Sequence, residues 1–307
     1  MKNRRFAAAA GAVFVAVLAI VATAALPAGA RTNAVSATAC PSQVRFGVEP
    51  YDTGAKFIGA YKALTAAVSK NLGCPVKLVI AENYTAEVEA MKAGKLEIGE
   101  FGPLGYIFAH KISKAEPVAV FGTKAHKPVT YTAAIWVAKD SPIKTVAELK
   151  GKTVAFADPA STSGNLEPRY AIIKAGLNPD KDVKIKFAGS HSASLLALTN
   201  GQVDAAEVNS QQEATASAAG QFDKTKFRPI WRSSPIPNDP ITVRGSLSPA
   251  FKAAVKKALL HLSIPQLKLV DTELGVDSGP MLPASDGMYK QIRDLVNTEH
   301  LDISAIG

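Results

Sequence analysis

Three hydroxyl side chains stand together in the segment Asp158-Pro-Ala-Ser-Thr-Ser-Gly164. The segment follows a strand-like run and precedes a helix-like run that carries Tyr170 and Ile173 on one face. Because Pro168 must lie in the first turn of that helix, the helix should begin near Asn165. Hydroxyls and free backbone N–H groups at a helix start favour negative charge. The segment therefore predicts a site for a tetrahedral oxyanion; the alternative is an ordinary Ser/Thr-rich helix cap.

A histidine lies on the next loop that joins a strand to a helix, in Gly189-Ser-His191. An imidazole can donate a hydrogen bond to an anion, and it binds the anion better when it is protonated. A lone histidine is more often structural or exposed. The position of His191, after a strand and next to the hydroxyl segment, favours a role in binding.

An enzyme is the competing class of function. Ser163, His191 and Asp204 could be imagined as a hydrolase triad, but the Gly-x-Ser-x-Gly elbow is absent and Asp204 lies within a predicted strand. The remaining histidines have no metal-ligand spacing; they are His110, His126, His261 and His300. We therefore expect a protein that is not an enzyme and that uses no metal and no cofactor.

The composition of the 307 residues limits the classes of function further. With 47% hydrophobic residues, disorder is excluded as the dominant state. The formal charge is +9, and Lys2, Arg4 and Arg5 contribute three of these charges before residue 31, so about +6 remains beyond it. That mild excess suits anionic ligands or a negatively charged cell surface. Without a block of Lys and Arg, we expect no nucleic-acid partner.

The first thirty residues have the pattern of a secretory signal peptide. A basic start precedes the apolar run Phe6–Leu26, which ends in the small residues Pro27-Ala-Gly-Ala30. We predict a signal peptide at 1–30 and a linker at 31–40. The alternative is an uncleaved membrane anchor, because the apolar run is long enough to span a bilayer. Either interpretation places the rest of the chain outside the cell membrane, in the periplasm or at the cell surface.

The two cysteines each come directly before a strand-like run. Cys40 precedes the run at 43–48, and Cys74 precedes the run at 75–80. If the two strands are parallel neighbours, both cysteines lie at the same end of the sheet. We therefore predict that an exported protein joins them in a disulfide. The alternative is a lipid anchor on Cys40, which the preceding sequence matches poorly.

Strand-like and helix-like runs alternate along the chain, and this pattern predicts an α/β fold with mainly parallel sheets. Thr145-Val-Ala-Glu148 is a capping box for a short helix. The predicted strands are 43–48, 76–81, 96–101, 153–157 and 183–187, and the predicted helices include 57–72, 85–93, 192–199 and one opened by Ser248-Pro249.

The chain also repeats itself weakly. Residues 83–101 align with residues 190–208 at a constant offset of 107, and Phe46-Gly-Val-Glu-Pro50 resembles Ala155-Phe-Ala-Asp-Pro159. The repeat predicts two similar α/β lobes that face each other. The alternative is that any two βαβ units share such a pattern.

In this repeat Tyr84 and His191 occupy equivalent loop positions, one in each lobe. Tyr131–Ala138 would leave the first lobe, and Pro235–Arg244 would return the chain to it. A ligand would then bind in the cleft, where hinge closure can bury it. The predicted lobes are 41–134 with 233–307, and 135–232.

From about Phe46 to Leu262, the chain resembles the exported solute-binding proteins of phosphate, phosphite and phosphonate ABC transporters. The resemblance implies the type II periplasmic binding protein fold, with two lobes, two crossover strands and a ligand cleft between the lobes. The motifs that carry it are Asn83-Tyr84-Thr-Ala, Asp158-Pro-Ala-Ser-Thr-Ser-Gly164, Gly189-Ser-His191, Asn200-Gly-Gln-Val-Asp204 and Ile236-Pro-Asn-Asp239-Pro.

The resemblance also implies roles for single residues. Tyr84 and Tyr131 would close the site, from the first lobe and from the first crossover. Asp239, at the second crossover, would accept a hydrogen from a protonated ligand oxygen or another donor, because a carboxylate beside a bare anion is unfavourable. Turn chemistry is the alternative for Asp239. Tyr106 would line the pocket or belong to the core. The groups that would cradle the phosphoryl oxygens are Ser161, Thr162, Ser163 and His191.

One departure bears on the ligand. Relatives that bind aminoalkyl phosphonates tend to carry an acid where this chain has Gln211-Gln212, and the strand position of Glu207 points its role elsewhere. We therefore expect phosphite, phosphate or a small uncharged alkyl phosphonate. Arsenite is a further possibility, although the relatives that bind it rely on cysteine.

The implied function is capture of a phosphorus oxyanion by hinge closure and delivery to an ABC permease, by a monomer. A solute-sensing subunit for a membrane kinase would show the same ligand chemistry and stays open as the alternative.

Overall fold

The computed structural model describes residues 40–299. The predicted signal peptide and residues 31–39 of the predicted linker lie outside these residues. In the part that is described, no helix combines the length and the apolar character needed to cross a membrane.

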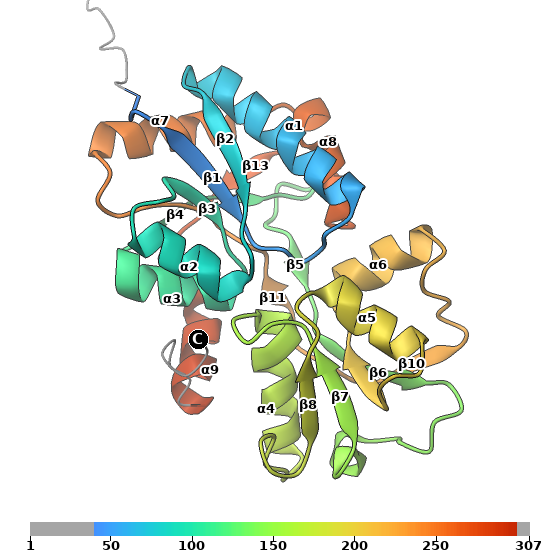
Figure 1. Ribbon diagram of the computed structural model, residues 1–307. Helices are drawn as coiled ribbons and strands as arrows, with labels where there is room; N and C mark the ends of the chain where they lie inside the picture. Colours follow the sequence, from blue (N-terminus) through green and yellow to red (C-terminus); the bar gives the residue numbers. More distant parts are fainter. Residues whose placement is uncertain (1–39, 300–307) are drawn as a thin grey trace, which may run out of the picture. The chain divides into compact units, whose positions relative to one another are not determined.

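The first lobe is built on a six-stranded sheet with the strand order β13-β4-β12-β3-β1-β2 (Figure 1). The three strands β2, β1 and β3 run parallel, whereas β12, β4 and β13 pair antiparallel beside them. The strands are β1 (Val44–Val48), β2 (Val76–Ile80), β3 (Ile98–Glu100), β4 (Glu116–Phe121), β12 (Ile241–Val243) and β13 (Met281–Pro283).

Two groups of helices cover the two faces of this sheet and form separate apolar clusters (Figure 1). On one face lie α1 (Ala55–Leu72), α7 (Pro249–Leu260) and α8 (Ile264–Glu273). On the other lie α2 (Tyr84–Lys92), α3 (Pro103–Ser113) and α9 (Lys290–Glu299), with the short helix η3 (Asp286–Tyr289) before α9.

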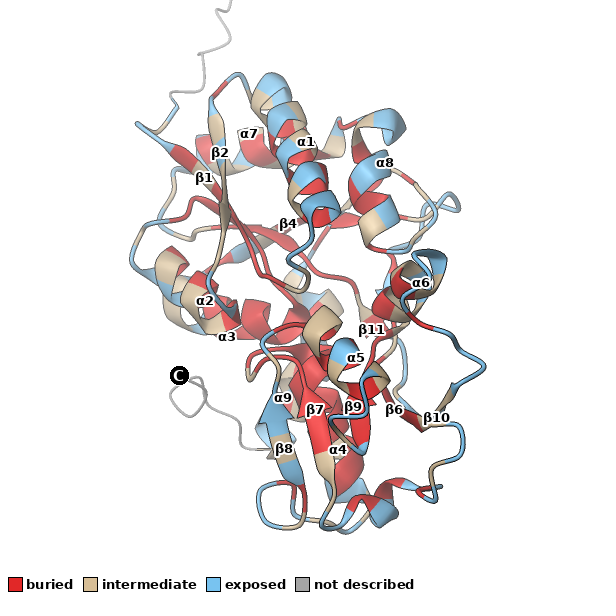
Figure 2. Cartoon of the chain, turned by 45° about the vertical axis from the view of Figure 1, so that its right-hand side comes forward, coloured by how far each residue is buried: buried red, intermediate tan, exposed pale blue. Residues whose placement is uncertain are grey.

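The second lobe is built on a five-stranded sheet with the order β10-β6-β9-β7-β8. Helices again cover both faces, so the middle strands β7 and β9 are buried, as Figure 2 shows in red. The strands are β6 (Ala134–Ala138), β7 (Thr153–Phe156), β8 (Lys184–Phe187), β9 (Ala205–Glu207) and β10 (Phe227–Arg232), and the helices are η1 (Val146–Leu149), η2 (Thr162–Leu166), α4 (Glu167–Lys174), α5 (His191–Thr199) and α6 (Ser210–Ala218).

Two short strands connect the sheets. β5 (Thr130–Tyr131) and β11 (Ile236–Pro237) pair antiparallel with each other, outside both large sheets. The chain passes from β4 through β5 into the second sheet, and it returns from β10 through β11 to β12. The expected α/β fold with two lobes and two crossover strands is thereby confirmed. The expectation of mainly parallel sheets is wrong: both large sheets are mixed, because the strands next to the crossovers, such as β6 and β12, pair antiparallel with their neighbours.

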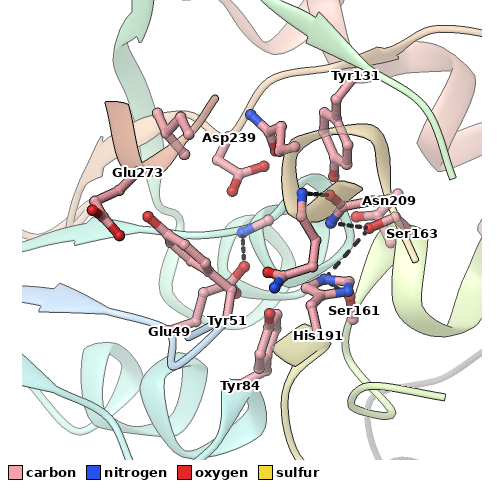
Figure 3. Close-up of a pocket in the computed structure, with 15 residues that line it drawn as sticks. Glu49, Tyr51, Tyr84, Tyr131, Ser161, Ser163, His191, Asn209, Asp239 and Glu273 are labelled. Carbon is pink, nitrogen blue, oxygen red and sulfur yellow. Dashed lines mark hydrogen bonds between the residues drawn. The ribbon is translucent and has the colours of Figure 1, made fainter. Parts of the chain in front are cut away.

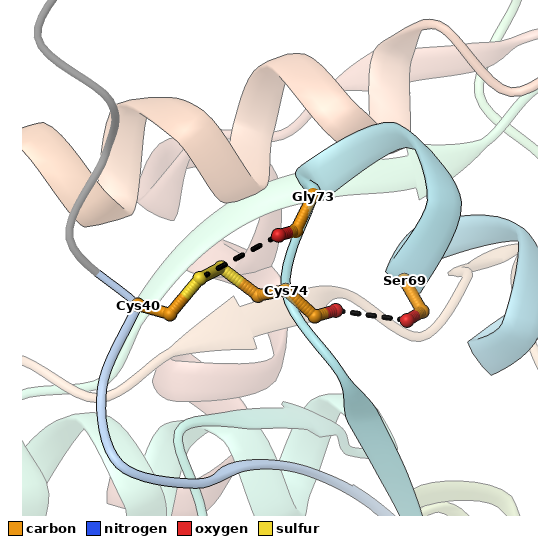
Figure 4. The surroundings of a disulfide bond; sticks show 4 residues. All are labelled: Cys40, Ser69, Gly73 and Cys74. Carbon is orange, nitrogen blue, oxygen red and sulfur yellow. Dashed lines mark hydrogen bonds between the residues drawn. A yellow bond between two sulfur atoms is a disulfide. The ribbon is translucent and has the colours of Figure 1, made fainter.

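The disulfide follows from the pairing of the first two strands. β1 and β2 are parallel neighbours in which Val44 lies opposite Val76. Cys40 and Cys74 therefore meet at the same end of the sheet and are joined, with their Cα atoms 5.8 Å apart (Figure 4). The Ser69 hydroxyl donates to the Cys74 carbonyl at 2.8 Å and fixes the turn that follows α1.

Candidate functional site

A small cavity of about 30 Å³ lies between the lobes, where strand ends of both sheets and the crossovers meet (Figure 3). Space of this size suits a ligand of only a few heavy atoms. Each lobe and each crossover contributes to the wall. The lining residues are Glu49, Tyr51, Tyr84, Gly102, Tyr131, Ser161, Thr162, Ser163, His191, Asn209, Gln211, Gln212, Asp239, Glu273 and Leu274.

The hydroxyl segment forms one wall. Ser161 has an extended backbone and caps the following turn, because its Oγ accepts the Gly164 N–H at 3.1 Å. The turn is a π-helix, η2, a form that often occurs at functional sites. A Cβ atom on Gly164 would lie 2.5 Å from the Cβ of Ala157 and 2.8 Å from the Ser161 hydroxyl, so only glycine fits there. The segment thus turns three adjacent hydroxyls toward one small space.

The helix after this turn differs from the prediction. We expected it near Asn165 with Tyr170 and Ile173 on one face; α4 begins at Glu167, and its buried residues include Ala171 and Ile172. Ile173 is 45% exposed. Tyr170 and Ile173 are three residues apart in α4 and share one face, as predicted, but the face that packs inward is the one that carries Ala171 and Ile172.

His191 lies at the start of α5, directly after the N-cap Ser190. Its Nε2 is 3.4 Å from Ser161 Oγ and 3.5 Å from Ser163 Oγ, and its Nδ1 is 2.8 Å from Glu207 Oε1. Burial lowers the pKa of His191, but Glu207, with help from Asp239 and Asp158, outweighs burial, so the pKa of His191 is raised. Nδ1 faces the Glu207 carboxylate and Nε2 faces the hydroxyls and the cavity. The raised pKa favours a ring that carries a proton on both nitrogens.

Sequence reasoning missed Glu207, whose strand position we interpreted as pointing away from the site. Glu207 is the last residue of β9 and is fully buried behind His191. The repeat contained a signal for it: Glu207 aligns with Glu100, the last residue of β3, at the same offset that aligns His191 with Tyr84. The matching acids at matching strand ends lie behind the cavity wall and pair with residues of their own lobe, Glu207 with His191 and Glu100 with Tyr61.

The other lobe and the crossovers contribute two tyrosines. Tyr84 is the first residue of α2, the position that corresponds to His191, and its buried hydroxyl has no protein partner. Tyr131 lies in the crossover strand β5, and its hydroxyl faces those of Thr162 and Ser163 (Figure 3). Both tyrosines line the cavity, Tyr84 at the position that the repeat made equivalent to His191 and Tyr131 at the first crossover.

Two buried carboxyl groups face the cavity, each with one oxygen that has no protein partner. Asp239 is 8% exposed and its Oδ1 has no partner. Burial raises the pKa of Asp239 to about 7, although His191 opposes the shift. Glu49, which we had not singled out, is 3% exposed; its Oε1 accepts the Gly102 N–H at 2.7 Å, while its Oε2 has no partner. Burial first, and then the neighbouring Asp239, raise the pKa of Glu49.

Tyr106 does not line the cavity. It lies in the core of the first lobe, packs on Tyr289 and donates from its hydroxyl to Asp286 at 2.6 Å. Asp204, considered for a hydrolase triad, is likewise elsewhere: its carboxylate accepts the Thr153 N–H at 2.8 Å. Within residues 40–299, no group of three or more His, Cys, Asp or Glu side chains is arranged to hold a metal ion.

Two amide side chains at the start of α6 donate hydrogen bonds to protein partners. The Gln211 side chain donates to Asn238 Oδ1 at 2.9 Å, and Asn209, the N-cap of α6, donates to Ser163 Oγ at 3.3 Å. Asn209 thus fixes one of the three hydroxyls, a contact that sequence reasoning also missed.

Direct contacts bridge the two lobes around the cavity. The Leu104 N–H, at the start of α3, donates to Thr162 Oγ1 at 2.8 Å, and the His191 N–H donates to the Tyr51 carbonyl at 3.2 Å. The lobes are therefore closed on each other, and the cavity is the space left between them.

Comparison with known proteins agrees with this geometry. The Phosphonate-bd family, described as "ABC transporter, phosphonate, periplasmic substrate-binding protein", matches residues 46–286. The phosphonates-binding periplasmic protein of Escherichia coli is 29% identical over 74% of this chain and 68% of its own, and the phosphate-import protein PhnD of Mycolicibacterium smegmatis is 27% identical over 71% of each. A crystal structure of a binding protein component of an ABC phosphonate transporter from Pseudomonas aeruginosa superposes with a TM-score of 0.75 at 25% identity, over 84% of this chain and 86% of that one. The chain belongs to the family of periplasmic substrate-binding proteins of phosphonate ABC transporters.

Proposed function

We propose that this protein is exported, captures a small phosphorus oxyanion between its lobes and delivers it to an ABC permease. Membership of a family of solute-binding proteins supports this function. The names of two relatives support the ligand class, since one is a phosphate-import protein and the other a phosphonates-binding protein. The proposed ligands are phosphate, phosphite and small phosphonates.

The observation that carries the proposal is the placement of consecutive hydroxyls against a histidine whose charged form is favoured by the Glu207 carboxylate behind it. The hydroxyl oxygens of Ser161 and Ser163 lie 3.4 Å and 3.5 Å from His191 Nε2 at the cavity. Such a group supplies both hydrogen-bond donors and one positive charge, which an oxyanion requires. We assign Thr162 to the same wall, Tyr84 and Tyr131 to closing the site, and Asp239 to accepting a ligand hydrogen.

Ser161, His191 and Glu207 also form a chain of contacts that resembles a hydrolase triad. In such a triad the histidine takes the proton of the serine, which requires a neutral ring. The raised pKa of His191 favours a ring that already carries both protons. The Ser161 oxygen also accepts the Gly164 N–H as a helix cap. Both features support binding of an anion over attack by the serine.

The contacts between the lobes support capture by hinge closure in a monomer. The bond from Leu104 to Thr162 can form only when the lobes meet, and the short strands β5 and β11 are suited to bend between them. Small-angle scattering should show a smaller radius of gyration with saturating ligand; an unchanged radius with confirmed binding contradicts closure. The lobes that we propose are residues 41–134 with 233–307, and residues 135–232.

A calorimetric panel tests the function directly. Residues 31–307 would be titrated with phosphate, phosphite, methylphosphonate and aminoethylphosphonate, with sulfate for comparison. At least one phosphorus oxyanion should bind, and Thr162→Val should weaken it roughly tenfold or more, because a hydrogen bond to a charged ligand is lost. Thr199→Val, on the same lobe but exposed, is the matched control and should leave affinity unchanged. Absence of binding by every phosphorus oxyanion contradicts the proposed function.

A further inference from the structure

One apolar cluster crosses the boundary between the lobes. Most of its members belong to α2, α3 and α9 of the first lobe, but Ala160 and Leu166 of the second lobe are buried in it as well. These two residues stand before and after the three hydroxyl residues, and they are 1% and 0% exposed. The segment that presents the hydroxyls is therefore anchored on the opposite lobe at both of its ends.

Helix α9 forms part of the surface on which this segment rests. It contacts α3 of its own lobe and η2 of the other lobe, and Figure 1 shows it beside both α3 and α4. Ile292 and Val296, four residues apart, form its buried face. Leu166 is the last residue of η2 and belongs to the same apolar cluster as these two side chains.

The C-terminal part of the chain is also attached to the second crossover. The hydroxyl of Tyr289, just before α9, donates to the Asn238 carbonyl at 3.0 Å, and Gln291 Nε2 donates to the Pro235 carbonyl at 2.9 Å. The two acceptors flank β11, the strand that returns the chain to the first lobe. α9 is thus fixed to the core of one lobe, to a crossover and to the turn that carries the hydroxyls.

The backbone transmits the position of Leu166 to the site. Its N–H donates to the Ser161 carbonyl at 3.1 Å within the π-turn. Ser161 is the residue whose Oγ lies 3.4 Å from His191 Nε2. Because Leu166 itself does not line the cavity, its side chain can act on a ligand only through this turn. A displacement of Leu166 would therefore move Ser161 relative to the ring that it faces.

We propose that Leu166 is a positioning residue for ligand capture, whose apolar contact with α9 holds the hydroxyls of the second lobe where they meet the anion. This inference rests on the proposed function and adds to the site a residue that does not touch the ligand. Because the turn is held before the ligand arrives, the hydroxyls need little reorganisation when they bind it.

Leu166→Ala gives the first test, by calorimetry with phosphate, phosphite and methylphosphonate at a temperature at which the variant is folded. Affinity for each ligand that the wild type binds should fall roughly tenfold, because a large-to-small change leaves a cavity under the turn. The factor should be similar for all of them, since the hydroxyls serve oxygens that these ligands share. Leu166→Met keeps the apolar volume and should bind within about threefold of the wild type.

Leu149→Ala is the matched control for this test. Leu149 is equally buried in the second lobe but belongs to a cluster within that lobe. The variant should lower the midpoint of thermal unfolding, as Leu166→Ala does, and leave the affinities unchanged. Wild-type affinity in Leu166→Ala, or an equal loss in Leu149→Ala, overturns the inference while the proposed function stands. If the wild type binds no phosphorus oxyanion, the proposed function itself fails.

Val296→Ala gives the second test, because it reaches the same contact from the first lobe with a milder change. Affinity should fall a few-fold. In the double variant with Leu166→Ala, the loss should be smaller than the product of the two single losses, since both changes remove one contact. Val255→Ala is the matched control, a buried valine of α7 in the other cluster of the first lobe, and it should bind like the wild type. Wild-type affinity in Val296→Ala, or losses that multiply independently, overturns the inference.

Discussion

The two sides of the cavity are built from matching positions, but the side chains at these positions have different hydrogen-bond partners. In the second lobe, Glu207 at the end of β9 pairs with His191 at the start of α5. In the first lobe, the corresponding Glu100 at the end of β3 accepts from the Tyr61 hydroxyl at 2.8 Å, and Tyr84 at the start of α2 is left without a partner. The polar side chains of the second lobe therefore have protein partners without a ligand, whereas Tyr84 of the first lobe does not. The difference shows how one repeated pattern can give a charged donor on one side and open acceptors on the other.

This difference affects both the cost of binding and the stability of the empty closed state. The donors of the second lobe are held in place before a ligand arrives, so binding costs them little reorganisation. The first lobe carries buried carboxyl groups whose partners arrive only with the ligand, which costs stability in the empty closed state. The first lobe is also the one that contains the disulfide. The following experiments separate these contributions, beginning with the largest effect.

Removal of the disulfide should lower the stability of the protein without changing the site. For Cys40→Ser combined with Cys74→Ser, we expect a loss of about 4 kcal/mol in the free energy of unfolding, from the loop that the bond closes. Urea unfolding measures this loss, and phosphate affinity is the control, because the bond lies at the end of β1 and β2 that faces away from Glu49. A loss below about 1 kcal/mol would contradict the entropic argument.

Glu100 should make the ligand-free protein less stable as the pH rises. Burial, together with the nearby Asp239, raises the pKa of Glu100 to about 8, against 4.5 for an exposed glutamate. Folding therefore keeps a proton on Glu100 that the unfolded chain releases, so its contribution is present at low pH and is lost between those two values. Between pH 5 and pH 8 the loss should be about 3 kcal/mol. In Glu100→Gln that part of the pH dependence should vanish from urea unfolding; an unaltered slope would mean that Glu100 is ionised in the folded protein.

His191→Ala should weaken ligand binding roughly tenfold to a hundredfold, because the charged donor of the second lobe is lost. The exposed His261→Ala is the matched control for calorimetry and should bind like the wild type. Unchanged affinity in His191→Ala would remove the second lobe from the proposed site.

Tyr84→Phe tests the first lobe at the corresponding position and should have the smallest effect. A neutral hydroxyl contributes about 0.5–1.5 kcal/mol, so affinity should fall about two- to tenfold. The variant should also be slightly more stable without ligand, since it removes a buried hydroxyl that has no partner. A loss of affinity as large as that of His191→Ala would show that the two sides contribute equally.

Much of the fold could be predicted from the sequence because its signals are local. The alternation of strands and helices and the capping box at Thr145 follow from patterns within short segments. The pairing of Cys40 with Cys74 needed one further assumption, that the two strands after them are parallel neighbours. Wherever a strand leads into a capped helix, the direction of the chain determines that the end of the strand and the start of the helix face the cleft. The same logic brought Tyr84 and His191 to one cavity from sequence positions that are far apart.

The acids of the site could not be assigned in this way. Whether Glu49, Glu207 or Asp239 faces the ligand depends on strand order, on lobe closure and on which neighbour takes the other carboxyl oxygen. Tyr106 illustrates the same limit, because its position on α3 becomes a core position only once Tyr289, from a distant part of the chain, packs on it. When the role of a side chain depends on contacts with distant parts of the chain, the neighbouring sequence does not predict that role.

Tyr131 belongs both to the paired crossover strands and to the cavity wall, which places the ligand at the pivot of the molecule. In a rotation about a hinge, the displacement of an atom grows in proportion to its distance from the axis. A shift of a fraction of an ångström beside Tyr131 therefore becomes a larger shift far from it. The outer ends of the lobes therefore move furthest for the least change at the site. Occupancy of a cavity that holds only a few atoms is in this way converted into a change of surface shape that a much larger partner can detect.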